Sequence, residues 1–408
     1  MRGGLTKRQD PDFASLHPGY ERERNTVDLL LNEQQNLLAE TAARLCANFG
    51  GPKRLRALNA AGGEMDKEAW HELIRAGWLS TVVAERHGGS GLGAFDFALV
   101  AEQAGKQLLP VPLVEAAAAA RTLSMATADG AQPSATLSEL LAGARVIVPA
   151  TTASFWSYGD GPSAVTFDGK ASSLSGTIPF VTFAQSAHAF LVAVESRPDT
   201  IVCVVPRDAP GVAVRTSRNV DGSTSSTLVL DHVGVTPHSV LATGAAAQRL
   251  TLDMQEFLML SAGVELLGLA AAALDVTLDY IKLRQQFGRP IGSFQVLQHR
   301  AVNSFIDIEL NRSLAYRVIS AFDAGEHDPA MVSAVKARTS RCALEIIRGA
   351  LQMHGAIGYT DQHDIGLYYK RAIALAARYG NELHHTGRFS DLTLGAPSAE
   401  RAQAGGLS

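Results

Sequence analysis

The sequence is poor in cysteine and has no excess of basic charge, and each shortage excludes a class of protein. Its 408 residues include three cysteines, Cys46, Cys203 and Cys342, too far apart for a disulfide framework or a metal-ligand spacing. We therefore expect buried or half-buried thiols and a reducing, cytoplasmic location. The formal net charge is -4 and no basic stripe stands out, which argues against a nucleic-acid partner.

Long apolar segments are also missing. A membrane-spanning helix needs about 20 consecutive apolar residues, whereas the best candidates, Val111–Ala120 and Val264–Leu274, are Ala-rich and shorter. The stretch Met1–Arg24 is polar and charged and has no apolar segment typical of a secretory signal. We expect no membrane association. With 46% hydrophobic and 19% charged residues, the chain is typical of a globular protein of two or three packed units.

Two common enzyme signatures are absent as well. A nicotinamide-binding fold needs βαβ alternation with a Gly-rich turn after its first strand, and the sequence has neither. No G-x-S-x-G elbow supports a serine hydrolase. The pair His384-His385 does not predict a metal site, because adjacent helical residues point about 100° apart and cannot chelate one ion together.

The first half of the chain predicts a helical domain over residues 26–144, after a tail over residues 1–25. Asp66 is placed to cap a helix that starts at Lys67, and Gly77 to end it. Ahead of it, apolar residues recur at three- and four-residue steps, which predicts one buried helix face. Its members are Leu29, Leu30, Leu37, Leu38, Ala42 and Leu45.

Residues 145–242 predict a β domain, because short runs rich in β-branched residues alternate with Gly, Pro, Asp and Ser. Long helices are then expected over about residues 250–282, 293–324, 328–354 and 362–380, within a bundle over residues 243–395 and before a tail over 396–408. The predicted fold class is α+β multidomain, with an N-terminal helical domain, a middle antiparallel β domain and a C-terminal four-helix bundle. The expected strand runs are Val146–Val148, Ala164–Phe167, Phe190–Val194, Ile201–Val205 and Thr227–Leu230.

Four segments resemble motifs of one family, the acyl-CoA dehydrogenases. Ala84–Gly93 is similar to "PEEYGGSGLG", and Arg284–Gln295 to "RxQFGxPIxxFQ". Gln352–Thr360 is similar to "QxxGGxGY", with Ala356 in place of the second Gly. Gly176–Ala184 is similar to "GxKxWITNA". Each segment also has a plainer explanation: a connector, a Gly-Pro turn with a solvated Arg, a helix-ending turn, or one face of an ordinary strand.

The resemblance implies an FAD-dependent oxidoreductase of this fold that takes part in fatty acid or lipid catabolism. It implies that Phe180 lies against the flavin ring and that Thr182 hydrogen-bonds flavin N5. A guanidinium suits a diphosphate because it is always charged and donates in pairs. Arg284 and Phe287 of one chain are expected to face Gln352–Ala356 of another. The cofactor-binding residues implied are Phe180, Thr182, Arg284, Gln286, Phe287, Gln295, Gln352, Gly355, Ala356 and Asn381.

The family pattern breaks where chemistry is expected. Members keep a Glu either just before a Gly in the last helical region or on the first bundle helix, and here those positions hold Tyr379 and Leu258. A phenol with an ordinary pKa of about 10 is a poor base at neutral pH. Glu265 lies seven residues beyond Leu258, on nearly the same helix face, and is our candidate for a relocated base, ahead of Glu256. The stretch "TEPxAGSD" is replaced by VIVPATTASFWS at residues 146–157.

A flavoenzyme of this fold with altered chemistry remains open, and so do two more specific functions. One is an FAD-dependent dehydrogenase that oxidises an acyl-CoA thioester at Cα–Cβ with a relocated base. The other is a base-less partner subunit of a heteromeric acyl-CoA dehydrogenase. Both imply an acyl-CoA partner, a homo-oligomer (dimer or tetramer) or a hetero-oligomer with a homologous subunit, and an electron acceptor such as an electron-transfer flavoprotein.

Overall fold

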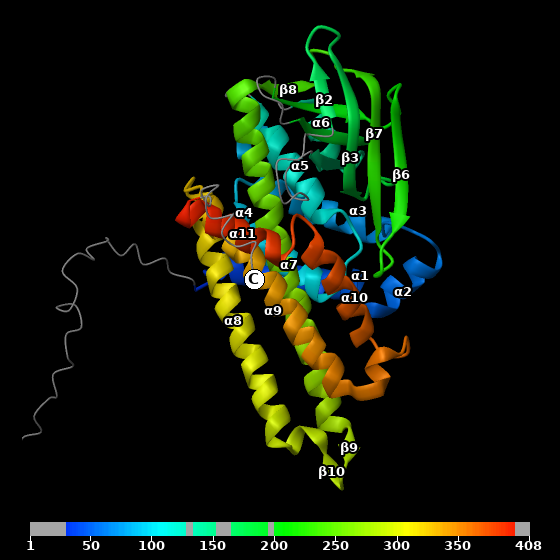
Figure 1. Ribbon diagram of the computed structural model, residues 1–408, viewed down its shortest axis with the longest axis vertical. Coiled ribbons are helices and arrows are strands. Elements are labelled where there is room, and N and C mark those ends of the chain that lie inside the picture. Colours follow the sequence, from blue (N-terminus) through cyan, green and yellow to red (C-terminus); the bar gives the residue numbers. More distant parts are fainter. Residues whose placement is uncertain (1–29, 128–133, 152–164, 195–199, 396–408) are drawn as a thin grey trace, which may run out of the picture.

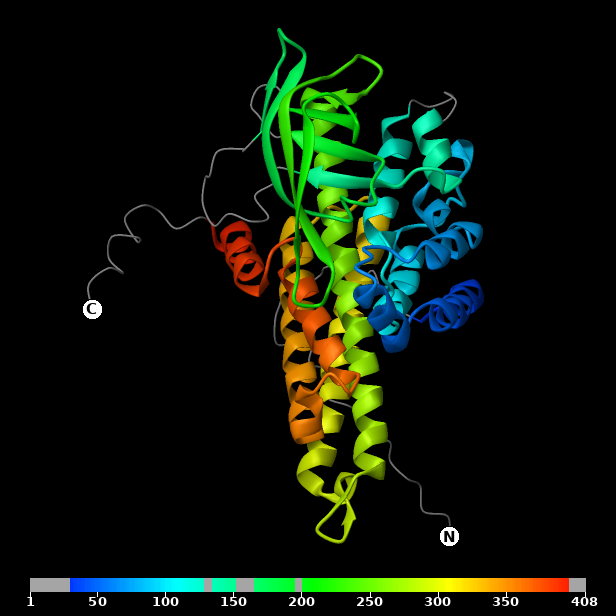
Figure 2. The ribbon, with the colours of Figure 1, turned by 90° about the vertical axis from the view of Figure 1, so that its right-hand side faces the viewer.

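The structure is a computed structural model that describes residues 30–127, 134–151, 165–194 and 200–395. An N-terminal helical region packs along one side of a long helical bundle, and a β region lies at one end of that bundle (Figures 1 and 2). This order of helices, strands and helices confirms the predicted fold class. The N-terminal helices are α1 (Glu33–Phe49), α2 (Pro52–Ala60), α3 (Lys67–Arg75), α4 (Ala94–Lys106), α5 (Leu113–Ala126) and α6 (Ala135–Leu141).

Local signals predicted α3 well and α1 only in part. The Asp66 carboxylate accepts the Ala69 amide at 3.0 Å, and Gly77 follows with a left-handed φ of 74°. In α1 the buried positions are Ala42 and Cys46, one turn apart. Adjacent residues on a helix point about 100° apart, and Leu37 is 61% exposed while its neighbour Leu38 is half-buried. The prediction that Leu37 belongs to the buried face was therefore wrong. Leu30 precedes the helix and is also exposed, and Leu29 lies outside the described residues.

In the described part of the chain the β region forms two four-stranded sheets. One has the order β1-β4-β5-β8 and the other β2-β3-β7-β6. All pairs are antiparallel except β1 with β4, which corrects the expectation of a wholly antiparallel domain. The chain between β1 and β4 passes through two strands of the other sheet, and a parallel pair needs such a crossover. The strands are β1 (Ile147–Thr151), β2 (Val165–Asp168), β3 (Ser173–Thr182), β4 (Ala189–Val194), β5 (Ile201–Pro206), β6 (Val212–Arg218), β7 (Thr224–Gly234) and β8 (Val240–Thr243).

The C-terminal bundle is built around the long helix α7 (Gly244–Leu283), which packs against α9 and against α4. Gly105 of α4 and Gly268 of α7 let these two backbones meet, since a Cβ at either position would lie about 2 Å from a carbonyl oxygen of the other helix. The remaining elements are β9 (Gln285–Gln286), β10 (Arg289–Pro290), α8 (Gln295–Asp323), α9 (Pro329–His354), α10 (Ile365–Ala377) and α11 (Glu382–Leu394).

Helix α7 is long and apolar enough to cross a membrane, so our expectation that no segment reaches that length was too strong. In its most apolar 18-residue stretch, however, 89% of residues are buried inside the protein, as in a core helix. The three cysteines are free and buried, as predicted. Burial raises the pKa of Cys46, Cys203 and Cys342 to about 12.

Candidate active site

A cavity of about 630 Å³ opens between the end of strand β3 and the turn that joins α10 to α11. Three residues predicted from the sequence line it, Phe180, Thr182 and Asn381. Its other lining residues are Asn219, Val220, Ser225, Ile373, Ala374, Ala377, Arg378, Gly380, Leu383 and His384.

Phe180 does not lie on an ordinary strand face. The pairing of β3 with β7 shifts register between Ile178 and Val181, and Phe180 takes a left-handed φ of 60°. This irregularity leaves Phe180 52% exposed beside the cavity, while Thr182, two residues on, is buried. A large aromatic ring held open to a cavity by a strained backbone is the arrangement of a ligand-binding residue rather than of a core residue.

The turn after α10 holds Tyr379, the residue that the resemblance aligns with the family's base. Helix α10 ends at Ala377, several residues before our expected end at about residue 380, because Tyr379 and Gly380 both have left-handed backbones, with φ of 58° and 95°. The Asn381 side chain then caps α11 by accepting the His384 amide at 2.9 Å. Gly380 packs tightly, since a Cβ there would lie 2.6 Å from the His385 ring.

Two buried side chains, Lys336 and His385, hold this turn by hydrogen bonds to its carbonyl oxygens. Nζ of Lys336 donates to the carbonyl oxygens of Ala376 and Gly380 and to Oγ of Ser340, each at 3.0 Å. Nε2 of His385 donates to the Tyr379 carbonyl oxygen at 2.7 Å. Burial, with a contribution from Arg378, lowers the pKa of Lys336 to about 7. Burial and Lys336 lower the pKa of His385 to about 3, so this imidazole is neutral.

A buried carboxylate that we did not predict, Glu115 of α5, meets the Tyr379 hydroxyl. Its Oε1 accepts from Oγ1 of Thr182 at 2.8 Å, from Nη1 of Arg378 at 3.1 Å and from the hydroxyl of Tyr379 at 3.1 Å. Glu115 and Arg378 are only 2% and 8% exposed. A charged residue inside the otherwise apolar run Leu113–Ala120 was the available signal, because a buried charge needs partners.

The electrostatics of this cluster keep the phenol protonated. Burial, reinforced by the negative charge of Glu115, raises the pKa of Tyr379 well above its usual range. Burial alone would lower the pKa of Arg378, but the neighbouring Glu115 raises it. At neutral pH Tyr379 is therefore a neutral phenol beside an ion pair.

None of the other three candidate positions is among the described residues that line the cavity. Leu258 is a core residue of α7, 1% exposed. Glu256 is buried and bonds Nδ1 of His327 at 2.7 Å. Glu265 is half-buried and is not among the described residues that line the cavity. Burial raises the pKa of Glu265, and Arg378 and Arg371 oppose the shift.

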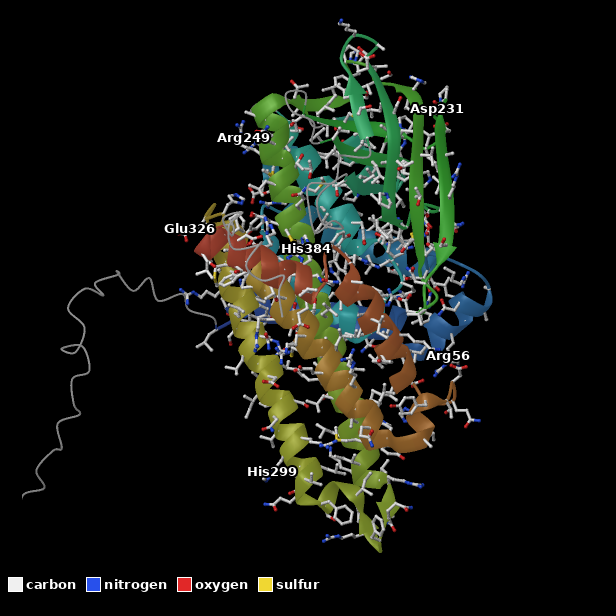
Figure 3. The ribbon with its side chains drawn as sticks, viewed as in Figure 1. Arg56, Asp231, Arg249, His299, Glu326 and His384 are labelled. Atoms are coloured by element: carbon white, nitrogen blue, oxygen red, sulfur yellow. The ribbon has the colours of Figure 1, made fainter. Side chains whose placement is uncertain are left out.

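The remaining predicted cofactor residues lie at the far end of the bundle. Arg284, Gln286, Phe287 and Gln295 surround the β9–β10 hairpin, which Figure 1 shows at the opposite end of the molecule from the sheets. Phe287 is 91% exposed with a φ of 54°. Figure 3 shows the same separation between His384, which lines the cavity, and His299, near the hairpin.

Gln352, Gly355 and Ala356 are exposed where α9 ends, beside the last turns of α7. There the Tyr280 hydroxyl donates to the His354 carbonyl oxygen at 3.2 Å, and the two rings stack with centroids 4.4 Å apart. Gly355 ends α9 with a left-handed φ of 68°. The structure thus divides the predicted cofactor residues into a group around the cavity and a group at the bundle end. Of the unusual stretch at residues 146–157, positions 152–157 lie outside the described residues.

Comparisons with known proteins agree with this architecture. Two family models match: "Acyl-CoA dehydrogenase, N-terminal domain" over residues 32–144 and "Acyl-CoA dehydrogenase, C-terminal domain" over residues 253–383. The acyl-CoA dehydrogenase FadE27 of Mycobacterium tuberculosis is 30% identical over 79% of this chain and 86% of its own. The acyl-CoA dehydrogenase IpdE2 of Mycolicibacterium smegmatis is 28% identical over 86% of this chain and 96% of its own.

Among solved structures, the ChsE4-ChsE5 complex from Mycobacterium tuberculosis is similar with a TM-score of 0.80, 25% identity and coverage of 91% of this chain and 100% of the matched chain. A variant of the Tcur3481-Tcur3483 steroid ACAD gives a TM-score of 0.77, 27% identity, and coverage of 91% and 99%. The fold and the two matching domains define an acyl-CoA dehydrogenase-like oxidoreductase. The chain belongs to the acyl-CoA dehydrogenase family. A glutaryl-CoA dehydrogenase in complex with FADH2 and PigA in complex with FAD have the same fold, which supports FAD as the cofactor.

The residues present fit that cofactor. The cavity is of the size that small-molecule and cofactor sites have, about 300–1,000 Å³. It offers an exposed aromatic ring at Phe180, and polar groups from Thr182, Asn381 and Asn219. When bound, FAD supplies the acceptor for the hydride that an acyl thioester releases.

Proposed function

We propose that this chain is the base-less subunit of a heteromeric acyl-CoA dehydrogenase. In this proposal it helps to hold FAD, while a homologous subunit that keeps the glutamate removes the substrate proton. The observation that carries the proposal is the hydrogen bond from the Tyr379 hydroxyl to Glu115, at the position where the family keeps its base.

Oxidation of an acyl thioester at Cα–Cβ needs a base for the α proton while the β hydrogen leaves as hydride. A general base must be deprotonated and must reach the proton it abstracts. Tyr379 has a raised pKa and directs its hydroxyl proton at Glu115, so it cannot accept another proton.

Glu115 is no better placed to act as the base. Its Oε1 already accepts three hydrogen bonds, and Arg378 neutralises its charge at 3.1 Å. That oxygen is not free to bind a substrate proton, and protonation of the carboxylate would leave the buried Arg378 without its counter-charge. We infer that the carboxylate holds Thr182, Arg378 and Tyr379 in place and takes no part in proton transfer.

The bundle end supports a second subunit. Within the described part of the chain Arg284 forms no salt bridge, and Phe287 projects almost fully into solvent. An always-charged guanidinium beside an exposed ring suits the diphosphate and adenine of FAD held by another chain. Two similar solved structures are titled as pairs of different proteins, ChsE4-ChsE5 and Tcur3481-Tcur3483, which supports a heteromer over a homo-oligomer. An electron-transfer flavoprotein would then receive the electrons.

One observation favours the alternative, a dehydrogenase with a relocated base. The pKa of Glu265 is raised by burial, as general bases often require, and its charge interacts with Arg378 of the cavity wall. Under this alternative Glu265→Gln would abolish flavin reduction by the purified protein while leaving FAD bound. Under our proposal the same variant changes no reaction rate.

The test is to co-express the chain with a homologue that retains the glutamate and to follow flavin bleaching by octanoyl-CoA under anaerobic conditions. We expect a stable complex in which Tyr379→Phe of this chain leaves the rate unchanged within about twofold. Replacing the homologue's glutamate with Gln should slow the rate by about 10²–10⁴-fold. The proposal fails if the second variant reduces its flavin normally, because the base would then have to lie in this chain.

A further inference from the structure

We infer that the Glu115–Arg378 ion pair fills the space in which an acyl thioester would lie, so that this chain excludes acyl groups from its own cavity. The inference rests on the proposed function and names the structural element that determines what the cavity accepts. It makes Glu115 and Arg378 specificity-determining residues.

The geometry of the reaction locates the space in question. The α and β carbons of the substrate must lie between the base and the hydride acceptor, and in this chain the resemblance puts Tyr379 and Thr182 on those two sides. Both hydroxyls contact the same atom, Oε1 of Glu115, at 3.1 Å and 2.8 Å. A substrate carbon would need about 3.5 Å to each neighbour, and the carboxylate already occupies the gap.

The cavity also ends at this cluster. Thr182 and Arg378 form part of its wall, whereas Glu115 lies behind them and is not among the described lining residues. Behind Glu115 the helix α5 continues with Ala116–Ala120, each 0% exposed. An acyl chain that passed the wall would therefore meet packed helix and not a tunnel.

The closure is built into the core and is not a mobile lid. It joins three elements that are far apart in sequence: α5 through Glu115, β3 through Thr182, and the turn after α10 through Arg378. Lys336 and His385 anchor that turn from the opposite side. Removing one charge alone would leave its buried partner uncompensated, so both must be removed together to open the space.

The experiment compares CoA with octanoyl-CoA by calorimetry on the FAD-loaded protein. For wild type we expect the two dissociation constants to agree within about twofold, because the acyl group finds no site. In Glu115→Ala/Arg378→Ala, octanoyl-CoA should bind at least about tenfold more tightly than CoA, since burying even two methylene groups is worth that much. CoA itself should bind as in wild type. A matched variant, Glu115→Gln/Arg378→Gln, removes the charges but keeps most of the volume and should behave like wild type.

The heteromeric complex gives a measurement that needs no variant. One octanoyl-CoA per pair of subunits is expected, and two per pair would overturn the inference. The inference would also be overturned if wild type bound octanoyl-CoA more than about tenfold more tightly than CoA. The same holds if Glu115→Ala/Arg378→Ala folded but bound octanoyl-CoA no more tightly than CoA. If wild type prefers octanoyl-CoA to CoA but its flavin is not reduced, only the inference of a filled acyl space is contradicted. If the chain alone reduces its flavin with octanoyl-CoA, the proposed function is contradicted.

Discussion

The two ends of the predicted cofactor site differ in how far this chain completes them. Around the cavity every polar group of the Tyr379 cluster finds a partner within the chain: Glu115, Thr182, Arg378 and the underlying Lys336. At the bundle end Phe287 is 91% exposed and the Arg284 backbone leads into a two-strand hairpin at the extreme of the molecule (Figure 1).

This difference indicates which part of the family's function the chain keeps. In our proposal the buried cluster is held together within this chain, and a structural ion pair lies where the family keeps its base. The 91% exposed Phe287 ring offers an apolar surface, and Arg284 a charged group, to another molecule. We infer that the chain retains the surface that serves a partner's cofactor and has given up proton abstraction in its own cavity.

The largest expected change in stability comes from removing one charge of the buried Glu115–Arg378 ion pair. Arg378→Met leaves Glu115 buried without a counter-charge, and we expect a loss of about 3–5 kcal/mol of unfolding free energy. Urea denaturation measures it. Arg341→Met is the matched control, because its ion pair with Glu345 is more than half exposed and screened by solvent, so its loss should leave stability nearly unchanged. Equal losses from both variants would show that the cavity cluster is not a structural core.

Lys336→Met should cost about 3 kcal/mol, because it leaves buried acceptors of the Tyr379 turn unpaired. The cost depends on pH with a defined sign. The pKa of Lys336 is about 7 in the folded protein and about 10.4 when unfolded, so between these values the unfolded state binds the extra proton. Wild-type stability therefore gains with rising pH relative to the variant. Urea denaturation at pH 7, 8 and 9 should show the difference widen; a constant difference would contradict a lowered pKa.

At the bundle end the effect should appear in cofactor binding and not in folding. Arg284→Ala should weaken FAD binding by about 1.5–3 kcal/mol, and Arg284→Lys by less, because Lys keeps the charge but loses the paired donors. Fluorescence titration of the heteromeric complex with FAD measures both, and Arg215→Ala on the exposed strand β6 is the control. Unchanged FAD affinity in Arg284→Ala would remove the bundle end from the cofactor site.

The smallest effect concerns Glu265. Since burial raises its folded pKa, the folded state binds a proton that the unfolded state has released, and wild-type stability falls as pH rises through that window. Glu265→Gln cannot ionise, so it should match wild type near pH 4 and exceed it at pH 8. Thermal unfolding at several pH values tests this, and a variant less stable than wild type at pH 8 would point to a favourable charge.

The sequence was sufficient where the signal was local. Apolar periodicity predicted the bundle, and contiguous motifs such as Arg284–Gln295 indicated the family. The Glu115 cluster could not be read in this way, because its partners lie 67, 263 and 264 residues away. Strands β3, β6 and β8 were missed because polar residues interrupt their apolar runs, and pairing with neighbouring strands decides their structure.

The irregular backbones were equally beyond the sequence. Phe180 and Tyr379 adopt left-handed conformations that bulky residues seldom take, so their residue types do not predict them. Glu265 was chosen from its spacing along α7, but spacing on one helix cannot show which side chain reaches a cavity formed by other elements.

The most direct test of the central claim is flavin reduction by this protein alone. The FAD-loaded chain is mixed anaerobically with excess octanoyl-CoA, and flavin absorbance is followed by stopped flow against the complex with a glutamate-containing homologue. Without a base in its own cavity, the isolated chain should bleach about 10²–10⁴ times more slowly than the complex. Bleaching of the isolated chain at the rate of the complex would contradict the account and show that a working base lies within this sequence.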